Sequence, residues 1–223
     1  MKILAFDAST EYCSTALWID GAVSSREQSA GITHSQLLLP QCQDVLAEAG
    51  YTFADLDGVA FGMGPGSFTG LRIACAVAQG LAFAADVPVV GVSGLQALAL
   101  ATGADKVIAC LDARMGEIYH ATYLRDDDNW QLLGDISVCH PSDAPRVTGS
   151  GWVGCGTGFK VYAEVLAARY GDALHHVDAA LYPRAGDIAA LAAKQFSLGL
   201  GQLAELAAPL YIRDKVALKI CER

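Results

Sequence analysis

The chain opens with short apolar segments that are separated by polar turns. Residues 3–6 form an apolar run that ends at Asp7. Residues 13–19 and 22–29 flank the dipeptide Asp20-Gly21, which is typical of a tight hairpin turn. The pattern therefore predicts three consecutive strands in antiparallel order.

A helical repeat follows these strands. Thr33 and Gln36 are spaced as in a capping box, and apolar positions then recur every three or four residues until Gly50. Pro40 lies inside this repeat, so we expect a kink there or a later helix start. The rest of this half predicts strands at 56–61 and 87–91, and helices at 67–85 and 95–101.

The second half of the chain repeats the plan of the first. Residues 106–113 (Lys-Val-Ile-Ala-Cys-Leu-Asp-Ala) echo residues 2–8 (Lys-Ile-Leu-Ala-Phe-Asp-Ala) with one extra residue. The pattern then predicts strands at 117–123, 131–138 and 152–154, and helices at about 160–169 and 186–198. We therefore expect a duplicated α/β fold with two lobes, each with a mixed sheet and flanking helices. The expected lobes are residues 1–103 and a partly degenerate repeat, residues 104–223.

This plan resembles the actin-like (ribonuclease H-like) fold of actin, the sugar kinases and Hsp70. In that fold the turn after the first strand faces a phosphate. Asp7, Ser9 and Thr10 occupy this turn and are candidates for binding a nucleotide or a hydrated magnesium ion. Alternatively, Asp7 and Ser9 bond only to N–H groups of their own turn.

A glycine-rich turn leads into the helix at 67–85. Residues 62–72 read Gly-Met-Gly-Pro-Gly-Ser-Phe-Thr-Gly-Leu-Arg, without the Gly-Lys-Ser/Thr ending of a Walker A loop. The backbone N–H groups of such a turn can bind an anion, with Arg72 in support. Alternatively, the glycines serve a tight turn and an N-cap, and Arg72 pairs with Asp55 or Asp57.

We assign no catalytic residue and no metal ligand from the sequence. His34 has Leu38 at the position where a metal-binding helix places its second ligand. The motifs His-Glu-x-x-His and Gly-x-Ser-x-Gly are absent from the sequence.

The composition of the chain indicates which partners and which cellular compartment to expect. The formal net charge is −9, whereas direct binding of nucleic acid normally requires a basic surface. The 7 cysteines include no Cys-x-x-Cys, so we expect free thiols in a reducing compartment. The start of the chain does not read as a signal peptide, and we expect no stretch to serve as a membrane span, which needs roughly 18–20 apolar residues. We expect a cytoplasmic protein without membrane contact.

Six strings together resemble the TsaB (YeaZ) family of bacterial tRNA threonylcarbamoyladenosine biosynthesis proteins. They are residues 3–10, 34–40, 64–72, 91–98, 112–119 and 209–213. The resemblance implies a non-catalytic scaffold or activating subunit that pairs with TsaD, which carries the metal site and the transfer chemistry, and with the small ATPase TsaE. The complex forms threonylcarbamoyladenosine (t6A) at the adenosine 3′ to the anticodon, in tRNAs that read codons beginning with A. The resemblance therefore places ATP and the metal on TsaD and TsaE, gives this chain no cofactor of its own, and brings tRNA only through the complex.

The resemblance also implies an interface on two helices of the first lobe, residues 34–49 and 67–85, with a homodimer through the same surface when TsaD is absent. The expected interface residues are Leu38, Cys42, Val45, Ile73, Val77 and Leu81. Small residues on several sides of the helix at 67–85 agree with a partner there, although core packing alone also explains them. The alternative is an enzyme in its own right: a phosphotransferase that uses ATP with Asp7 and Asp112, or a peptidase-like enzyme, for which the sequence offers no motif.

Overall fold

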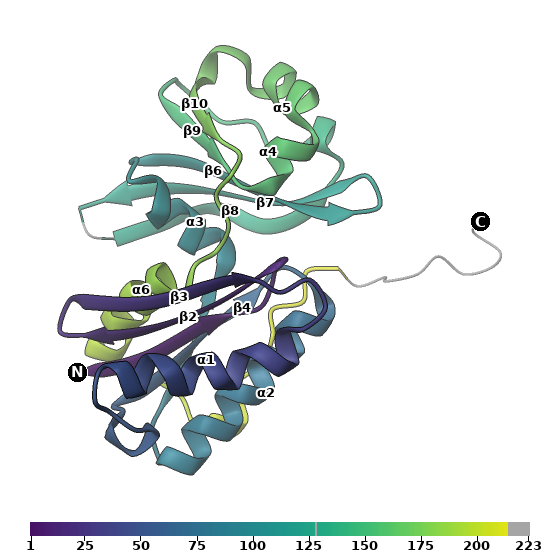
Figure 1. Cartoon of the computed structure of the whole chain (residues 1–223). Coiled ribbons are helices and arrows are strands. Elements are labelled where there is room, and N and C mark those ends of the chain that lie inside the picture. Colours follow the sequence, from purple (N-terminus) through teal and green to yellow (C-terminus); the bar gives the residue numbers. More distant parts are fainter. Residues whose placement is uncertain (128, 214–223) are drawn as a thin grey trace.

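Two five-stranded sheets form the two lobes of the computed structural model, which describes residues 1–127 and 129–213 (Figure 1). The first sheet consists of β1 (Lys2–Asp7), β2 (Tyr12–Ile19), β3 (Ala22–Ser29), β4 (Gly58–Gly64) and β5 (Val89–Ser93). The second consists of β6 (Lys106–Arg114), β7 (Glu117–Asp126), β8 (Asn129–Cys139), β9 (Trp152–Cys155) and β10 (Leu174–Asp178). The helices are α1 (His34–Glu48), α2 (Phe68–Ala85), α3 (Gly94–Thr102), α4 (Thr157–Val161), α5 (Ala163–Tyr170) and α6 (Ala185–Ser197). Short 3₁₀ turns cover Phe53–Asp55, Pro141–Asp143, Gly171–Ala173 and Ala204–Leu206.

The two sheets share one topology. Their strand orders are β3-β2-β1-β4-β5 and, read from the matching edge, β8-β7-β6-β9-β10. In each sheet the first three strands are antiparallel and the last two join in parallel. The echoed segments form the equivalent central strands β1 and β6. The predicted duplicated α/β fold is therefore confirmed, and β10, which the pattern did not predict, completes the second copy.

Both faces of the first sheet are covered, which explains the continuous apolar run of β1. Leu4 and Phe6 belong to the core under α1 and α2, whereas Ile3 and Ala5 belong to the core under α6. Successive side chains of a strand point to opposite faces, so a strand covered on both sides is apolar at every position. Helices α3 and α6 lie between the two sheets (Figure 1).

The expected lobe boundary at residue 103 needs a correction. Helix α6, which we assigned to the C-terminal lobe, packs on β1 and β2 of the first sheet. The segment after it, residues 202–211, also returns to the first lobe, where Gln202 bridges to Val89. The boundary at residue 103 separates the strands of the two sheets. Helix α6, however, belongs to the second half of the chain and packs on the first sheet.

Three local predictions also need correction. Helix α1 begins at His34 and continues through Pro40, which excludes the later start, one of the two effects that we expected of this proline. Thr33 makes no side-chain cap; its hydroxyl instead donates to the carbonyl of Ala30 (2.8 Å). The single helix predicted at about 160–169 is two helices, α4 and α5, that meet at Tyr162.

Helix α2 is long and apolar enough, by length and composition alone, to cross a membrane. This finding differs from our expectation that no stretch could serve as a membrane span. However, α2 packs on β4, and its buried residues are Gly70, Leu71, Ala74, Cys75, Ala78 and Ala82. We therefore interpret α2 as a core helix of the first lobe whose outward side is also apolar.

Candidate functional site

The glycine-rich turn packs directly on the turn that follows β1. A Cβ atom added to Gly62 would lie 1.8 Å from Oδ2 of Asp7, and one added to Gly70 would lie 1.8 Å from the carbonyl oxygen of Ala8. The N–H of Ser67 donates to the carbonyl of Ser9 (2.7 Å). These glycines allow two backbone segments to touch. The geometry therefore supports the tight-turn alternative, in which the two turns are in direct contact.

The carboxyl group of Asp7 is buried, and only one of its two oxygens is hydrogen-bonded by the residues that the structure describes. Its Oδ1 accepts hydrogen bonds from the backbone N–H (2.9 Å) and the hydroxyl (2.8 Å) of Ser9. Its Oδ2 has no hydrogen-bond partner among the described residues. Burial raises the pKa of this carboxyl to about 7, against the opposing effect of the Ser9 hydrogen bonds. Thr10 is likewise engaged locally, since its Oγ1 accepts from the N–H of Tyr12 (3.3 Å).

The second half repeats this arrangement around Asp112. Its carboxylate pairs with Arg114 (3.0 Å) and accepts from the hydroxyl of Tyr162 (3.4 Å). The matching glycine turn, residues 154–158, packs on β6 in the same way, since a Cβ added to Gly156 would lie 2.4 Å from the carbonyl oxygen of Cys110. Neighbouring groups of the chain therefore hold the carboxylate of Asp112 and one oxygen, Oδ1, of the Asp7 carboxyl.

Histidine and cysteine side chains do not assemble into a metal site in residues 1–127 and 129–213. His34 is buried, and its Nε2 lies 3.3 Å from the carbonyl oxygen of Tyr12. The six cysteines within the described part of the chain are free thiols, as predicted, and Cys221 lies outside it.

Arg72 has a different role from the ones we expected. It pairs with neither Asp55 nor Asp57 among the described contacts; its Nε donates to the hydroxyl of Tyr211 (2.9 Å). Its guanidinium also lies 3.8 Å from the ring centre of Phe68, a cation–π distance. Arg72 thus fastens the C-terminal segment to the start of α2.

The predicted interface residues divide into two groups. Leu38, Cys42 and Val45 are fully buried in the core between α1 and the sheet, so they cannot contact a partner in this conformation. This part of the prediction is corrected, because the apolar stripe of α1 faces its own sheet. The other three, Ile73, Val77 and Leu81, lie on α2 and are only half-buried.

The outward face of α2 is apolar and open. We define it by the exposed residues Thr69, Ala76, Gly80, Phe83 and Ala84 together with the half-buried Ile73, Val77 and Leu81. Their spacing places them on one side of a helix. Phe83 is 81% exposed, and a Cβ added to Gly80 would meet nothing within 4 Å.

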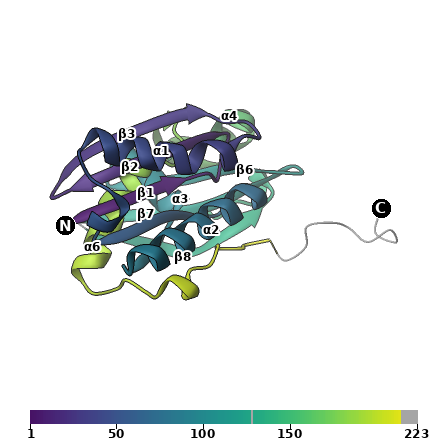
Figure 2. The same ribbon diagram turned by 60° about the horizontal axis from the view of Figure 1, so that its bottom comes forward.

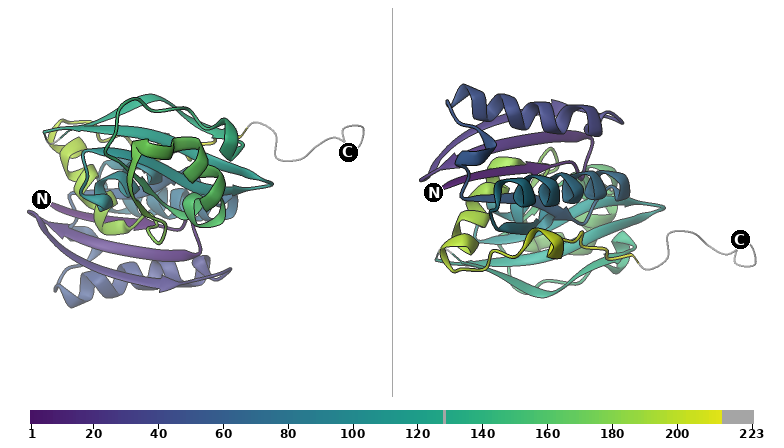
Figure 3. Two further views of the ribbon diagram at one scale, coloured as in Figure 1. Left: turned by 90° about the horizontal axis from the view of Figure 1, so that it is seen from above. Right: turned by 90° about the horizontal axis from the view of Figure 1, so that it is seen from below.

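The C-terminal segment flanks this face on one side, as α1 does on the other (Figures 2 and 3). Ala207 accepts hydrogen bonds from Gln79 (2.9 Å) and from the thiol of Cys75 (3.4 Å). Leu203 and Leu206 nevertheless remain 64% and 60% exposed. Our sequence analysis missed this contribution, although leucines that recur after residue 198 without a helical pattern were the available signal.

The comparisons with known proteins connect this chain with the biosynthesis of threonylcarbamoyladenosine in tRNA. The family model described as "TsaD: tRNA N6-adenosine threonylcarbamoyltransferase" matches residues 26–220. The Escherichia coli protein named tRNA threonylcarbamoyladenosine biosynthesis protein TsaB is 39% identical over 98% of this chain and 97% of its own. The Haemophilus influenzae protein of the same name is 37% identical over 74% of this chain and 75% of its own. The chain belongs to the TsaB family.

Solved structures support the same assignment. YeaZ from Pseudomonas aeruginosa superposes with a TM-score of 0.87 at 40% identity, covering 94% of this chain and 99% of its own. A second P. aeruginosa structure, described as an uncharacterized protein with similarity to peptidase YEAZ, gives 0.88 at 40% identity, covering 95% and 99%. The two-lobed actin-like fold expected from the sequence is thus the fold of the TsaB family.

The contrast between two glycines of α2 gives a direct test of the tight-turn interpretation in this TsaB-family chain. We expect Gly70→Ala to lower the free energy of unfolding by about 3 kcal/mol, because the added methyl group overlaps the backbone of Ala8. Gly80→Ala should raise it by about 0.5–1 kcal/mol, because its site is open and alanine favours the helix. Urea unfolding measures both. Equal effects of the two substitutions would contradict the packing role of Gly70.

Proposed function

We propose that this chain is a non-catalytic scaffold subunit in t6A biosynthesis, and that the outward face of α2 binds a TsaD-type protein. One observation carries the proposal: an 18-residue helix of the first lobe presents an apolar side that the rest of the described chain leaves uncovered. Exposed apolar surfaces of this kind mark protein interfaces. The names of the relatives supply the pathway.

A TsaD-type partner fits this face because the two chains are related. The family model that matches this chain carries the TsaD description, so a TsaD protein is expected to have the same fold and an equivalent pair of helices. Two related folds can pack like faces against each other around a pseudo-twofold axis. The transfer chemistry, ATP and the metal then belong to TsaD and TsaE, and tRNA reaches this chain through the complex.

The state of its two aspartates supports a non-catalytic role. A phosphotransferase of this fold would use Asp7 and Asp112 toward a nucleotide and its metal. Here one oxygen of Asp7 is held by Ser9 and the other faces Gly62, while Asp112 is held by Arg114 and Tyr162. Both carboxylates serve the turns in which they lie.

Reconstituted tRNA modification tests this proposal. Purified TsaD, TsaE, threonylcarbamoyl-adenylate and an acceptor tRNA should form t6A only when this chain is added, as measured by nucleoside mass spectrometry. The double variant Asp7→Asn/Asp112→Asn should restore modification as well as the unmodified chain does, because neither carboxylate takes part in the reaction. Full modification without the chain would contradict the scaffold role. Loss of modification with a folded, TsaD-bound double variant would favour the enzyme alternative.

A further inference from the structure

The outer strand of the first sheet has an open edge. All eight residues of β3 pair with β2 in unbroken register, and β3 stands at the end of the sheet. In the described part of the chain no other strand pairs with its outer side. Alternate N–H and C=O groups of β3 therefore point away from the sheet without a strand partner.

The other sheet edges are partly covered, short or irregular, which distinguishes them from β3. The edge of β5 is covered at its first residue, where Gln202 exchanges two backbone hydrogen bonds of 2.9 Å with Val89. Strand β10 has only 5 residues and irregular pairing, and the register of β8 shifts along β7. Proteins usually cover, shorten or bend their edge strands, and a long regular edge is a template for another strand.

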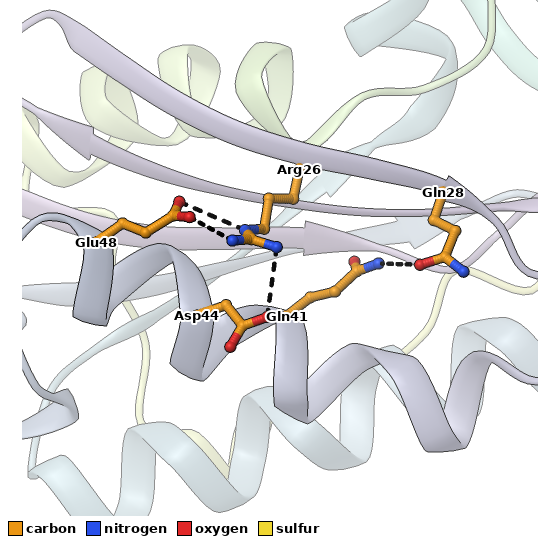
Figure 4. Close-up of polar contacts among 5 residues, drawn as sticks. All are labelled: Arg26, Gln28, Gln41, Asp44 and Glu48. Atoms are coloured by element: carbon orange, nitrogen blue, oxygen red, sulfur yellow. Dashed lines mark hydrogen bonds and ion pairs between the residues drawn. The ribbon is translucent and has the colours of Figure 1, made fainter.

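A hollow of about 320 Å³ opens beside this edge, between β3 and α1. Leu37 and Pro40 of α1 provide apolar lining. The polar lining comes from Arg26, Glu27, Gln28, Gln41 and Asp44, of which all but Glu27 are drawn in Figure 4. The side chain of Arg26 is already engaged across the hollow: it donates to the carboxylate of Glu48 and pairs with Asp44 (3.4 Å). Its charge is therefore neutralised within the protein.

The hollow contains a buried acceptor without a donor. Gln41 is only 7% exposed, and its Nε2 donates to Oε1 of Gln28 (3.5 Å). Its Oε1 has no hydrogen-bond partner among the described residues. A buried acceptor left without a donor costs free energy, so the site favours a ligand that donates. Two carboxylates, Asp44 in the lining and Glu48 beside it, pair with the single guanidinium of Arg26 and leave a net negative charge at this end of the hollow, so the donor that complements it is a cation.

We propose that β3 binds an extended segment of a partner protein by strand addition, with a lysine side chain of that segment in the hollow against Gln41 and Asp44. An added strand lies about 4.8 Å from β3, and every second side chain of it projects over the α1 side. Main-chain hydrogen bonds supply affinity, and the hollow selects the lysine. This site lies on the opposite side of α1 from α2 and does not depend on the α2 interface.

Spectra of the ¹⁵N-labelled full chain test the site with two designed probes. The first is a blocked octapeptide of alternating threonine and valine with one central lysine, and the second has glutamate in place of the lysine. The lysine peptide should shift the backbone amides of residues 22–29 and 37–48 and bind at least tenfold more tightly than the glutamate peptide. Absence of shifts on β3, or equal affinity for the two peptides, would overturn the proposal.

Three substitutions at two glutamines locate the selectivity in the hollow. Gln41→Leu should weaken binding of the lysine peptide at least fivefold, whereas Gln43→Leu, at an exposed position of the same helix, should leave it unchanged. Gln41→Glu should strengthen it, because a carboxylate replaces the amide next to the ammonium group. Unaltered binding by Gln41→Leu would also overturn the proposal.

Discussion

The Asp7→Asn variant should be more stable than the unmodified chain above neutral pH, and about equally stable near pH 4. Burial raises the pKa of this carboxyl in the folded protein to about 7, from 3.8 in the unfolded chain. Between these values the folded state holds a proton that the unfolded state has lost, so the free energy of unfolding falls as pH rises. The raised pKa corresponds to about 4 kcal/mol of stability lost across this window. An asparagine carries no charge at any of these pH values and should avoid the loss.

The measurement is the difference in unfolding free energy between variant and unmodified chain, from urea denaturation at several pH values. The difference is required because His120 acts in the opposite direction. Burial lowers the pKa of His120 to about 4, so this group adds stability as pH rises from about 4 to 6.5. Both proteins contain His120, and its contribution cancels. A difference that stays constant with pH would show that Asp7 is not a buried acid in the folded state.

The pattern of apolar residues was sufficient to predict the duplicated fold, because strands covered on both faces and helices covered on one face leave different periods. It was not sufficient to place α6, since an amphipathic helix near residue 190 fits either sheet equally well. Its position is decided by contacts with Ile3, Ala60 and Val90, which are distant in sequence.

The candidate site was predictable only in part, for a related reason. Periodicity shows that α1 has one apolar stripe and that α2 is apolar nearly all round, but it does not show which apolar side the sheet covers. Leu38 therefore resembled an interface residue although it belongs to the core. The partner of Arg72 was also beyond local reasoning, because Tyr211 is 139 residues away along the chain.

A single arginine on the outward face of α2 should separate this chain from its partner without unfolding it. Gly80 is the position of choice, because the site is exposed and an added side chain meets no atom within 4 Å. In Gly80→Arg, a large charged group would have to be buried in an apolar contact. We expect the affinity for a TsaD-type protein to fall by on the order of 100-fold, with an unchanged or slightly higher melting temperature.

Co-elution on size exclusion and calorimetric titration with purified TsaD would measure this loss. The matched control is Ala190→Arg on α6, an exposed small residue on the helix layer that covers the other face of the sheet. The control adds the same charge and should bind TsaD as the unmodified chain does. If the expected homodimer uses the same surface, Gly80→Arg should also be a monomer by sedimentation when studied alone. Normal binding of TsaD by a folded Gly80→Arg variant would move the interface away from α2, because no complex can bury this face and also accommodate the arginine at its centre.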